Sequence, residues 1–336
     1  MKEGTRIQLE KRTKLENVIP LDTPFVLYVD PSSFCNLKCF YCYHSQKQKN
    51  IKFGLMFLDT FKEILKQSLE FPSPIKVLRL YGFGEPLLNP NFTQFVNLAK
   101  QTSKFETIDV TTNGIFLNFK LIDELVDLGL DRINISLMGV GFKDYKKITQ
   151  KYVDFENLVE NIKYFYNKKN RKCKIFVKIN ADILENQQDL EKFKKIFAPI
   201  SDELGIEHLM SCWDEVEGFE ANKQVGIYGQ FLQNINVCPY IFYSLMVQYD
   251  GKVSACFLDW NRKLILGDIK TQLLKDIWEG EKLFNIQKLM LEGNRKKIIP
   301  CNKCSQLTHG MCDNIDGYAS SLITKVTTKF LKKENK

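Results

Sequence analysis

The sequence predicts an α/β fold of repeated β/α units, followed by a small cysteine-rich module built from a β-hairpin and a helix. Short apolar, β-branched runs alternate with longer amphipathic stretches from about residue 24 to residue 211, which is typical of parallel β/α units. After about residue 230 this alternation stops, and a hairpin signal, a helical pattern and several cysteines follow. A chain of 336 residues is long enough for one large domain and one such module.

Six strands with helices between them are expected in the first part of the chain. The predicted strands are short apolar runs at residues 25–29, 77–81, 107–112, 132–137, 174–180 and 206–210. The clearest helical patterns cover residues 59–69, 92–102 and 121–128, the last followed by Gly129. Active sites of parallel α/β folds lie at the carboxyl ends of the strands. The residues that follow these runs are therefore the first candidates for function.

The second part of the chain has its own signals. Residues 245–256 predict two short strands around Asp250 and Gly251, a strong hairpin signal. A helical pattern follows at residues 271–291, and residues 322–333 favour a short amphipathic helix only weakly because they are rich in β-branched residues. The expected divisions are an N-terminal extension, a core, a cysteine-rich module and a basic tail, at residues 1–20, 21–230, 231–318 and 319–336.

Composition narrows the class of protein. The chain is 44% hydrophobic and 26% charged, and it contains neither an apolar run long enough to span a membrane nor a signal peptide. We therefore expect a cytoplasmic protein, in which ten cysteines indicate metal binding or redox chemistry rather than disulfides. The net charge of +8 lies largely at the two ends. We interpret these ends as solvated, because no nucleic-acid-binding motif accompanies them.

Three cysteines follow the first predicted strand. Cys35, Cys39 and Cys42 have the spacing C-x3-C-x2-C, and three thiolates can hold three irons of a [4Fe–4S] cluster while leaving the fourth iron open. With Tyr41 before the last cysteine, this motif resembles that of the radical S-adenosylmethionine (radical SAM) enzymes. The resemblance implies a partial (β/α)6 barrel, similar to a TIM barrel. It also implies that S-adenosylmethionine binds the open iron through its amino and carboxylate groups.

Other strand ends carry matching motifs. Residues 82–86, Gly-Phe-Gly-Glu-Pro, resemble the Gly-Gly-Glu-Pro loop of the family with Phe83 inserted. The resemblance implies cofactor-binding roles for a set of residues at strand ends or beside the cysteines: Tyr41, Gly82, Gly84, Glu85, Ser136 and Asn180. Tyr41 would pack near the adenine, while backbone carbonyls and Glu85 would accept hydrogen bonds from the ammonium group. Each has a structural alternative, since such glycines form turns and Ser or Asn often caps a helix.

A second group of cysteines lies in the C-terminal module. Cys238, Cys256, Cys301 and Cys304 resemble the auxiliary-cluster region of the SPASM and twitch subgroups of radical SAM enzymes. This resemblance implies one auxiliary [4Fe–4S] cluster, so two clusters in all, and four thiolates would leave it no open iron. The alternative is a zinc site held by the same four thiolates. Cys312 could be a spare thiol, an alternative ligand or part of the substrate site.

The resemblance also implies a chemistry. Reductive cleavage of S-adenosylmethionine would give a 5′-deoxyadenosyl radical that abstracts hydrogen from the substrate, with the auxiliary cluster as electron acceptor. An iron–sulfur oxidoreductase acting on a small polyol or sugar is expected. The alternatives are peptide or protein modification (oxidation, epimerisation or cross-linking) and a non-catalytic iron–sulfur electron carrier.

Two further expectations concern residues and partners. By position, the candidates for the base that deprotonates an alcohol are Glu215, Asp259 and His309. The expected partners are a small-molecule or peptide substrate and a reducing electron donor such as flavodoxin or ferredoxin. Only 34 residues precede Cys35, so we expect no peptide-leader-binding domain before it.

Overall fold

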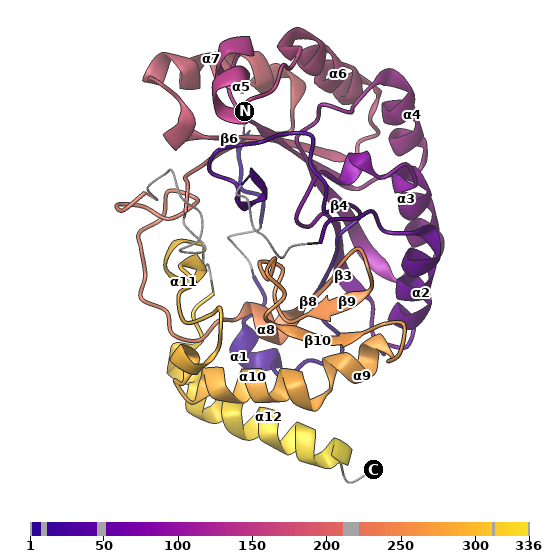
Figure 1. Cartoon of the computed structure of the whole chain (residues 1–336), viewed down its shortest axis with the longest axis vertical. Coiled ribbons are helices and arrows are strands. Elements are labelled where there is room, and N and C mark those ends of the chain that lie inside the picture. Colours follow the sequence, from indigo (N-terminus) through magenta and orange to yellow (C-terminus); the bar gives the residue numbers. More distant parts are fainter. Residues whose placement is uncertain (1, 8–11, 46–51, 211–221, 311–312, 335–336) are drawn as a thin grey trace.

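One curved, mostly parallel sheet forms the centre of the computed structural model (Figure 1). The structure describes residues 2–7, 12–45, 52–210, 222–310 and 313–334. The strands pair in the order β1-β7-β6-β5-β4-β3-β2-β8-β9-β10. Their bounds are β1 Lys2–Glu3, β2 Val26–Val29, β3 Ile75–Leu80, β4 Phe105–Thr112, β5 Arg132–Leu137, β6 Lys174–Asn180, β7 Glu203–Glu207, β8 Ser244–Val247, β9 Lys252–Ser254 and β10 Ile265–Asp268. The expected parallel strands of a partial barrel are thus confirmed as β2 to β7.

Helices cover the outer face of these parallel strands, with α2, α3, α4 and α6 forming an arc in Figure 1. The α-helices are α1 Leu15–Val18, α2 Leu58–Ser68, α3 Phe92–Gln101, α4 Phe119–Asp127, α5 Phe142–Thr149, α6 Phe155–Lys168, α7 Gln187–Phe197, α8 Tyr240–Tyr243, α9 Leu274–Trp278, α10 Glu281–Leu291, α11 Gln306–His309 and α12 Ala319–Glu334. Buried aromatic rings join neighbouring helices, as where Phe61 stacks on Phe95 at 4.4 Å between centroids. Among the described helices, none has the length and apolarity needed to cross a bilayer.

The strands divide apolar from polar side chains. In β3, Leu78 and Leu80 are fully buried in the core beneath the helices, whereas Arg79 contacts Asp109 of β4. Successive side chains of a strand point to opposite faces of the sheet, so Arg79 points into the lumen of the barrel. The outer face therefore stabilises the fold, and the lumen face is left for polar groups.

The C-terminal module continues the barrel sheet instead of forming a separate body. Strand β8 pairs in parallel with β2, with Val26 opposite Ser244 and Val29 opposite Val247. Strands β8 and β9 form the expected hairpin, and Gly251 in its turn has φ of +92°, a conformation that glycine adopts readily. The module is thus joined directly to the strand that precedes the first cysteines.

Two expected elements differ in the structure. The sixth barrel strand, expected at residues 206–210, is β7 and begins at Glu203, because Gly205 lies within it and leaves room for the Phe176 ring, which a Cβ would meet at 2.3 Å. The helix expected at residues 271–291 is interrupted at Gly280, where the backbone is extended. A Cβ there would lie 2.8 Å from the carbonyl of Asp276. Helices α9 and α10 are therefore separate.

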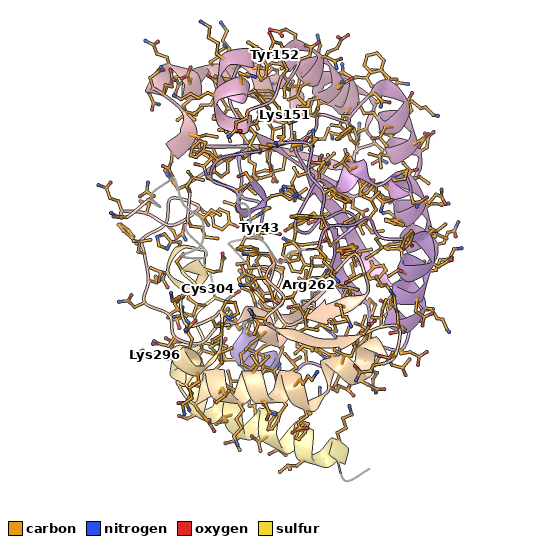
Figure 2. The ribbon with its side chains drawn as sticks, in the orientation of Figure 1. Tyr43, Lys151, Tyr152, Arg262, Lys296 and Cys304 are labelled. Carbon is orange, nitrogen blue, oxygen red and sulfur yellow. The ribbon has the colours of Figure 1, made fainter. Side chains whose placement is uncertain are left out.

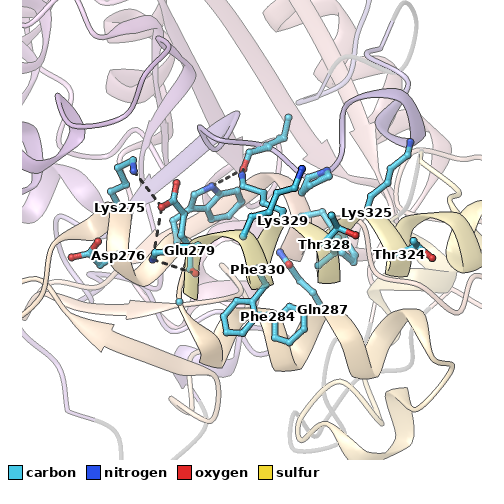
Figure 3. Close-up of a pocket in the computed structure, with 18 residues that line it drawn as sticks. Lys275, Asp276, Glu279, Phe284, Gln287, Thr324, Lys325, Thr328, Lys329 and Phe330 are labelled. Carbon is cyan, nitrogen blue, oxygen red and sulfur yellow. Dashed lines mark hydrogen bonds and ion pairs between the residues drawn. The ribbon is translucent and has the colours of Figure 1, made fainter. Parts of the chain in front are cut away.

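The C-terminal helix α12 packs against α10, where Phe284 and Phe330 stack at 4.1 Å between centroids. The expected amphipathic helix is thus present. A cavity of about 950 Å³ lies beside it (Figure 3). Trp278 Nε1 and Lys329 Nζ both donate to the carbonyl of Leu21 at its wall, at 3.1 and 2.8 Å. The lining includes none of the predicted site residues.

Candidate functional site

The first three cysteines share one loop at the carboxyl edge of the sheet. Cys35, Cys39 and Cys42 lie between β2 and the 3-10 helix Tyr43–Ser45. The N–H of Cys42 donates to the carbonyl of Cys39 at 2.9 Å. The N–H of Lys38 donates to the carbonyl of Thr149 at 3.1 Å, at the end of α5. The loop is therefore held both by its own turn and by α5.

The three thiols lie close together in a buried setting. Burial, with the nearby Glu85 and Cys42, raises the pKa of Cys35 to about 12. Burial and the other two cysteines raise the pKa of Cys39 further above its usual value. Metal ligation requires thiolates, and thiolates in this setting need a bound positive charge beside them. The donor set therefore fits a metal cluster that supplies this charge.

The loop of residues 82–86 lies against the cysteine loop. The N–H of Glu85 donates to the carbonyl of Phe34 at 2.7 Å. A Cβ on Gly84 would lie 2.2 Å from the same carbonyl oxygen and 2.6 Å from that of Ser32. Only glycine fits there. The structure thus brings together the two loops that the sequence singled out.

The carboxylate of Glu85 ties two strand ends together. Its Oε1 accepts hydrogen bonds from the hydroxyl of Thr112 at 2.6 Å and from the N–H of Leu87 at 3.0 Å. Its Oε2 accepts from the N–H of Asn113 at 2.8 Å, and the amide of Asn113 in turn donates to Asn36 Oδ1 at 2.8 Å. Burial raises the pKa of Glu85 to about 7. These bonds give Glu85 a framework role, and a contact of its carboxylate with a ligand ammonium group stays a prediction.

Tyr41, Ser136 and Asn180 lie at or beside the ends of β5 and β6. The hydroxyl of Tyr41 donates to Met138 Sδ at 2.7 Å, just after β5, and Ser136 lies one residue before the end of that strand. Asn180 ends β6, and its Oδ1 accepts from the N–H of Asp182 at 3.0 Å. Asn180 therefore caps a short 3-10 helix, as the structural alternative predicted. Ligand contacts from these three residues stay predictions.

Four other cysteines come together from three separate segments. Cys238 precedes α8, Cys256 follows β9, and Cys301 and Cys304 precede α11. Burial, followed by the nearby Cys301 and Cys304, raises the pKa of Cys238, and burial with all three neighbours raises that of Cys256. Electrostatic effects of this kind fall with distance. The fold therefore gathers the four predicted ligands of the second cluster.

A zinc ion and a [4Fe–4S] cluster need different arrangements of these four cysteines. Within the described ranges, no three Cys, His, Asp or Glu side chains are close enough to hold a single metal ion. A mononuclear zinc site places four ligands around one ion, with zinc–sulfur distances of about 2.3 Å. A [4Fe–4S] cluster places each thiolate on a different iron. The two alternatives therefore require different spacings of the four thiolates.

The two cysteine-bearing parts meet at a pair of aromatic rings. Tyr43 follows Cys42 directly, and its ring centroid lies 3.4 Å from that of Trp260 in the loop that begins at Cys256. Figure 2 shows Tyr43 near the centre of the molecule, with Arg262 of the same loop below it in this view. The C-terminal module therefore borders the first cysteine loop.

Asp259, one of the expected bases, holds this loop together. Its Oδ2 accepts from the hydroxyl of Ser254 at 2.7 Å and from the N–H of Leu264 at 2.8 Å. Its Oδ1 accepts from the N–H of Lys263 at 2.7 Å. Burial raises the pKa of Asp259 to about 6. Both oxygens accept hydrogen bonds from the framework, and a role of Asp259 as catalytic base stays a prediction.

His309 is likewise a framework residue. Its Nδ1 lies 3.2 Å from the carbonyl of Ser305 and its Nε2 lies 3.1 Å from the carbonyl of Asn222. Both ring nitrogens thus face backbone carbonyls, and a role of His309 as base stays a prediction. Glu215, the third candidate, and Cys312 lie outside the described residues.

Charged residues that the sequence interpretation left out line the lumen. Arg79 Nε lies 3.5 Å from Asp109 Oδ2, Arg132 Nη2 lies 3.0 Å from Glu203 Oε2, and Lys178 contacts a carboxylate on β7. Each alternates with apolar neighbours along its strand. A period-two search for polar residues inside the predicted strands is the signal that could have found them.

The lumen contains space and unsatisfied polar atoms. A cavity of about 600 Å³ is lined by Arg79 and Asp109, by residues 3–7, and by Arg132 and Glu203, the first residues of β5 and β7, so it lies toward the amino ends of the strands. Among the described residues, Arg79 Nε, Asp109 Oδ1 and Glu207 Oε1 are buried without a hydrogen-bond partner. Such atoms cost free energy unless water or a ligand completes them. This end of the lumen therefore suits water or a polar ligand, but it lies opposite the carboxyl edge of the sheet that carries the first cysteines.

Asp30 is a buried carboxyl directly after β2. It lies two residues beyond Tyr28 and so on the same face of the sheet. Its Oδ1 accepts weakly from the N–H of Phe83 at 3.3 Å, and within the described residues its Oδ2 has no hydrogen-bond partner. A Cβ on Gly82 would lie 2.5 Å from Oδ1, so glycine is required there. Burial raises the pKa of Asp30 to about 7.

Two family models match the chain. The model of the radical SAM superfamily matches residues 29–196, and that of an iron–sulfur cluster-binding domain, SPASM, matches residues 238–305. These ranges contain all seven cysteines of the two sets described above. The description of the second model favours iron–sulfur over zinc for the C-terminal set.

Three of the curated relatives that match the chain represent two activities. A probable GTP 3′,8-cyclase of Methanococcus maripaludis is 40% identical over 125 residues, which span 37% of this chain and only 39% of that relative. One from Methanocaldococcus jannaschii is 32% identical over 76% of this chain and 90% of its own length. A relative from Niallia circulans, an S-adenosyl-L-methionine-dependent 2-deoxy-scyllo-inosamine dehydrogenase, is 23% identical over 84% and 93%.

Solved structures share the fold. BtrN in complex with AdoMet and 2-DOIA has a TM-score of 0.57 and 21% identity, covering 87% of this chain and 97% of that one. Streptococcus suis SuiB bound to the precursor peptide SuiA has a TM-score of 0.64 and 14% identity, covering 87% and 72%. At these identities the likeness is one of architecture.

Proposed function

Because the chain belongs to the radical SAM superfamily, we propose that it is an oxidoreductase that uses S-adenosylmethionine to oxidise a small polyol or amino-sugar-type alcohol. When bound, its two [4Fe–4S] clusters would supply the electron that cleaves S-adenosylmethionine and accept the electron that the substrate loses. The Niallia circulans relative supports this class, because its name describes a dehydrogenase of 2-deoxy-scyllo-inosamine and the alignment spans 84% of this chain.

The first cysteine set would hold the cluster that binds S-adenosylmethionine. Cys35, Cys39 and Cys42 supply three thiolates and leave one iron for the amino and carboxylate groups of that ligand. Asn113 and Glu85 fasten the surrounding loops to each other through the hydrogen bonds to Asn36 and Thr112. Loops held in this way keep the reacting groups oriented and restrict water.

The second cysteine set favours oxidation over a reaction that needs an open iron. Cys238, Cys256, Cys301 and Cys304 would ligate every iron of a second cluster, so the substrate has no iron to bind directly. A fully ligated cluster next to the site is suited to accept an electron. This supports a two-electron oxidation rather than a redox-neutral cyclisation.

The fully thiolate-ligated second set, together with the alignment to the 2-deoxy-scyllo-inosamine dehydrogenase of Niallia circulans, is the observation that carries the substrate class. The charged groups of the lumen do not add to it. Arg132 and Glu203 are the first residues of β5 and β7, so they lie at the amino ends of the strands, opposite the edge that carries the cysteines.

Asp30 is the carboxyl that we assign to removing the hydroxyl proton of the substrate. It lies at the same strand edge as the first cysteines and keeps one buried oxygen without a hydrogen-bond partner in the described part of the chain. A base works best when its pKa is near the working pH, and burial brings that of Asp30 to about 7. Asp259 and His309, by contrast, have their polar atoms engaged.

A substrate comparison tests this proposal. The protein is reconstituted anaerobically with iron and sulfide, reduced with dithionite, and given S-adenosylmethionine with either 2-deoxy-scyllo-inosamine or GTP. We expect 5′-deoxyadenosine and a ketone product in equal amounts with the aminocyclitol, and no cyclised product with GTP, measured by mass spectrometry. Cyclisation of GTP without oxidation of any polyol in a panel of cyclitols would contradict the proposal.

A further inference from the structure

A basic and aromatic surface lies directly outside the first cysteine loop. We call it the α5 surface and define it by Lys38, Phe142, Lys146, Lys151 and Tyr152. The side chain of Tyr152 is 79% exposed and that of Phe142 is 37% exposed, and their rings lie 4.4 Å apart between centroids. Lys146 Nζ lies 5.9 Å from the centroid of Tyr152. Figure 2 shows Lys151 and Tyr152 toward the upper edge of the molecule.

The backbone joins this surface to the cysteines. The N–H groups of Lys38 and Phe40, on either side of Cys39, donate to the carbonyls of Thr149 and Ile148 at 3.1 Å each. Helix α5 then ends at Gln150, whose φ of +58° turns the chain outward into Lys151 and Tyr152. A protein that contacts this surface would therefore lie against the outer side of the loop that carries Cys39.

The charge around the loop is positive. Residues 31–58 contain four lysines and no Asp or Glu. Within the described residues, neither Lys146 nor Lys151 forms a salt bridge, whereas Lys147 is paired with Glu185 at 2.7 Å. The acidic residue of α5, Asp144, is turned back to accept from the N–H of Val140 at 2.7 Å. The surface therefore presents lysines next to exposed aromatic rings.

We propose that the α5 surface is the docking site of a small acidic flavodoxin, which delivers the electron to the cluster held by Cys35, Cys39 and Cys42. This inference rests on the proposed function, which requires one electron for each cleavage of S-adenosylmethionine. The flavodoxin loses that electron and the cluster gains it, so the transfer is balanced. Complementary charge speeds association and selects partners, and exposed aromatic residues are enriched at protein interfaces.

The test compares two reductants on one variant. Lys146→Glu with Lys151→Glu reverses the charge of the α5 surface, and Lys62→Glu with Lys66→Glu makes the same change on α2, a separate flank of the barrel in Figure 1. At low salt, we expect the α5 variant to lose about tenfold or more of the flavodoxin-supported rate of 5′-deoxyadenosine formation. Its dithionite-supported rate and both rates of the α2 variant stay at the wild-type level.

Direct binding gives a readout that does not depend on activity. The dissociation constant of a purified acidic bacterial flavodoxin, measured calorimetrically at low salt, should rise about tenfold in the α5 variant only, and should rise with salt in the wild type. Equal binding by both variants, or no binding by the wild type, would overturn the docking site. If dithionite supports no cleavage in the wild type while flavodoxin still binds at α5, the docking stands and the proposed function fails.

Discussion

The two cysteine sets bring their thiol groups together in opposite ways. Cys35, Cys39 and Cys42 come from one loop, and the strand ends hold that loop through Glu85, Asn113 and Asn36. Cys238, Cys256, Cys301 and Cys304 come from three segments that meet only when β8, β9 and the last loop have folded together. The first site is thus local in sequence, whereas the second depends on assembly.

This difference predicts which structural disturbances would separate the ligands of each site. A local loop keeps its ligands near one another even when distant parts are disturbed, because few residues separate them. An assembled site loses ligands when any one of its segments moves. Arg295 holds part of the second site, since its Nε donates to the carbonyl of Cys301 at 2.8 Å and its Nη2 donates to that of Cys304.

The largest effect should come from removing one ligand of the first set. Cys42→Ala should abolish formation of 5′-deoxyadenosine, because the cluster that binds S-adenosylmethionine loses one of its three thiolates. Cys301→Ala with Cys304→Ala should keep this cleavage and lose the oxidised product. Both products are measured in the same chromatographic assay. If Cys42→Ala still cleaves S-adenosylmethionine, then the first set is not the one that cleavage requires, and the two sets do not differ in this role.

The second-largest effect should come from a change at Asp30, which directly follows β2 and precedes the first cysteine loop. Asp30→Asn keeps an acceptor for the N–H of Phe83 but removes the proposed base, so product should fall by roughly 10²- to 10⁴-fold while binding of S-adenosylmethionine is unchanged. In the wild type, burial raises the pKa of Asp30 to about 7. The carboxylate form is the base, so product formation should rise with pH through about 7.

The variant Asp30→Asn should lose this rise, and Asp127→Asn, an exposed change on α4, should keep it. The measurement is the rate of product formation between pH 5.5 and 8.5, in buffers of constant ionic strength. A pH profile that is the same in Asp30→Asn and wild type would assign the proton to another group.

A framework change should separate stability from chemistry. Glu85→Ala leaves the buried donors of Thr112, Asn113 and Leu87 without their acceptor, so the free energy of unfolding should fall by about 3 kcal/mol. Urea denaturation of the metal-free protein measures this change, with the exposed Glu70→Ala as its control. If Glu85→Ala is as stable as Glu70→Ala, then the carboxylate is not what holds the strand ends.

The smallest effect should be confined to the second set. Arg295→Ala removes donors from the carbonyls of Cys301 and Cys304, a loss of about 1 to 2 kcal/mol. Iron in the second cluster should fall while cleavage of S-adenosylmethionine continues, as measured by iron content and 5′-deoxyadenosine. The neighbouring exposed Lys296→Ala (both Lys296 and Cys304 are labelled in Figure 2) is the matched control. Equal iron in both variants would show that Arg295 does not hold the site.

Sequence reasoning worked best where function is local. The spacing of Cys35, Cys39 and Cys42 and the glycine loop at residues 82–86 predicted two neighbouring loops, and the N–H of Glu85 joins them in the structure. The parallel strands and the hairpin followed from periodicity and from Asp250 and Gly251. These features depend on residues close together in the chain, so one sequence is enough to predict them.

Features that depend on tertiary contacts were not predictable in the same way. Asp259 and His309 were expected as bases from position alone, whereas their hydrogen-bond partners are set by how the loops fold. Arg79 could have been found from the period-two alternation along its strand, whereas Asp30 was missed because a charged residue after a strand gives no sign that it will be buried. Gly205 lies inside β7 because of the distant Phe176 ring, which no local pattern shows.

The most direct test of the two-site account is a spectroscopic count of the clusters. The protein is reconstituted anaerobically, its iron is measured, and electron paramagnetic resonance spectra of the reduced protein are recorded with and without S-adenosylmethionine. The account predicts about eight irons per chain, as in two four-iron clusters, and a change in only one of two signals when S-adenosylmethionine binds. Iron for a single cluster, or a spectrum that S-adenosylmethionine leaves unaltered, would contradict it.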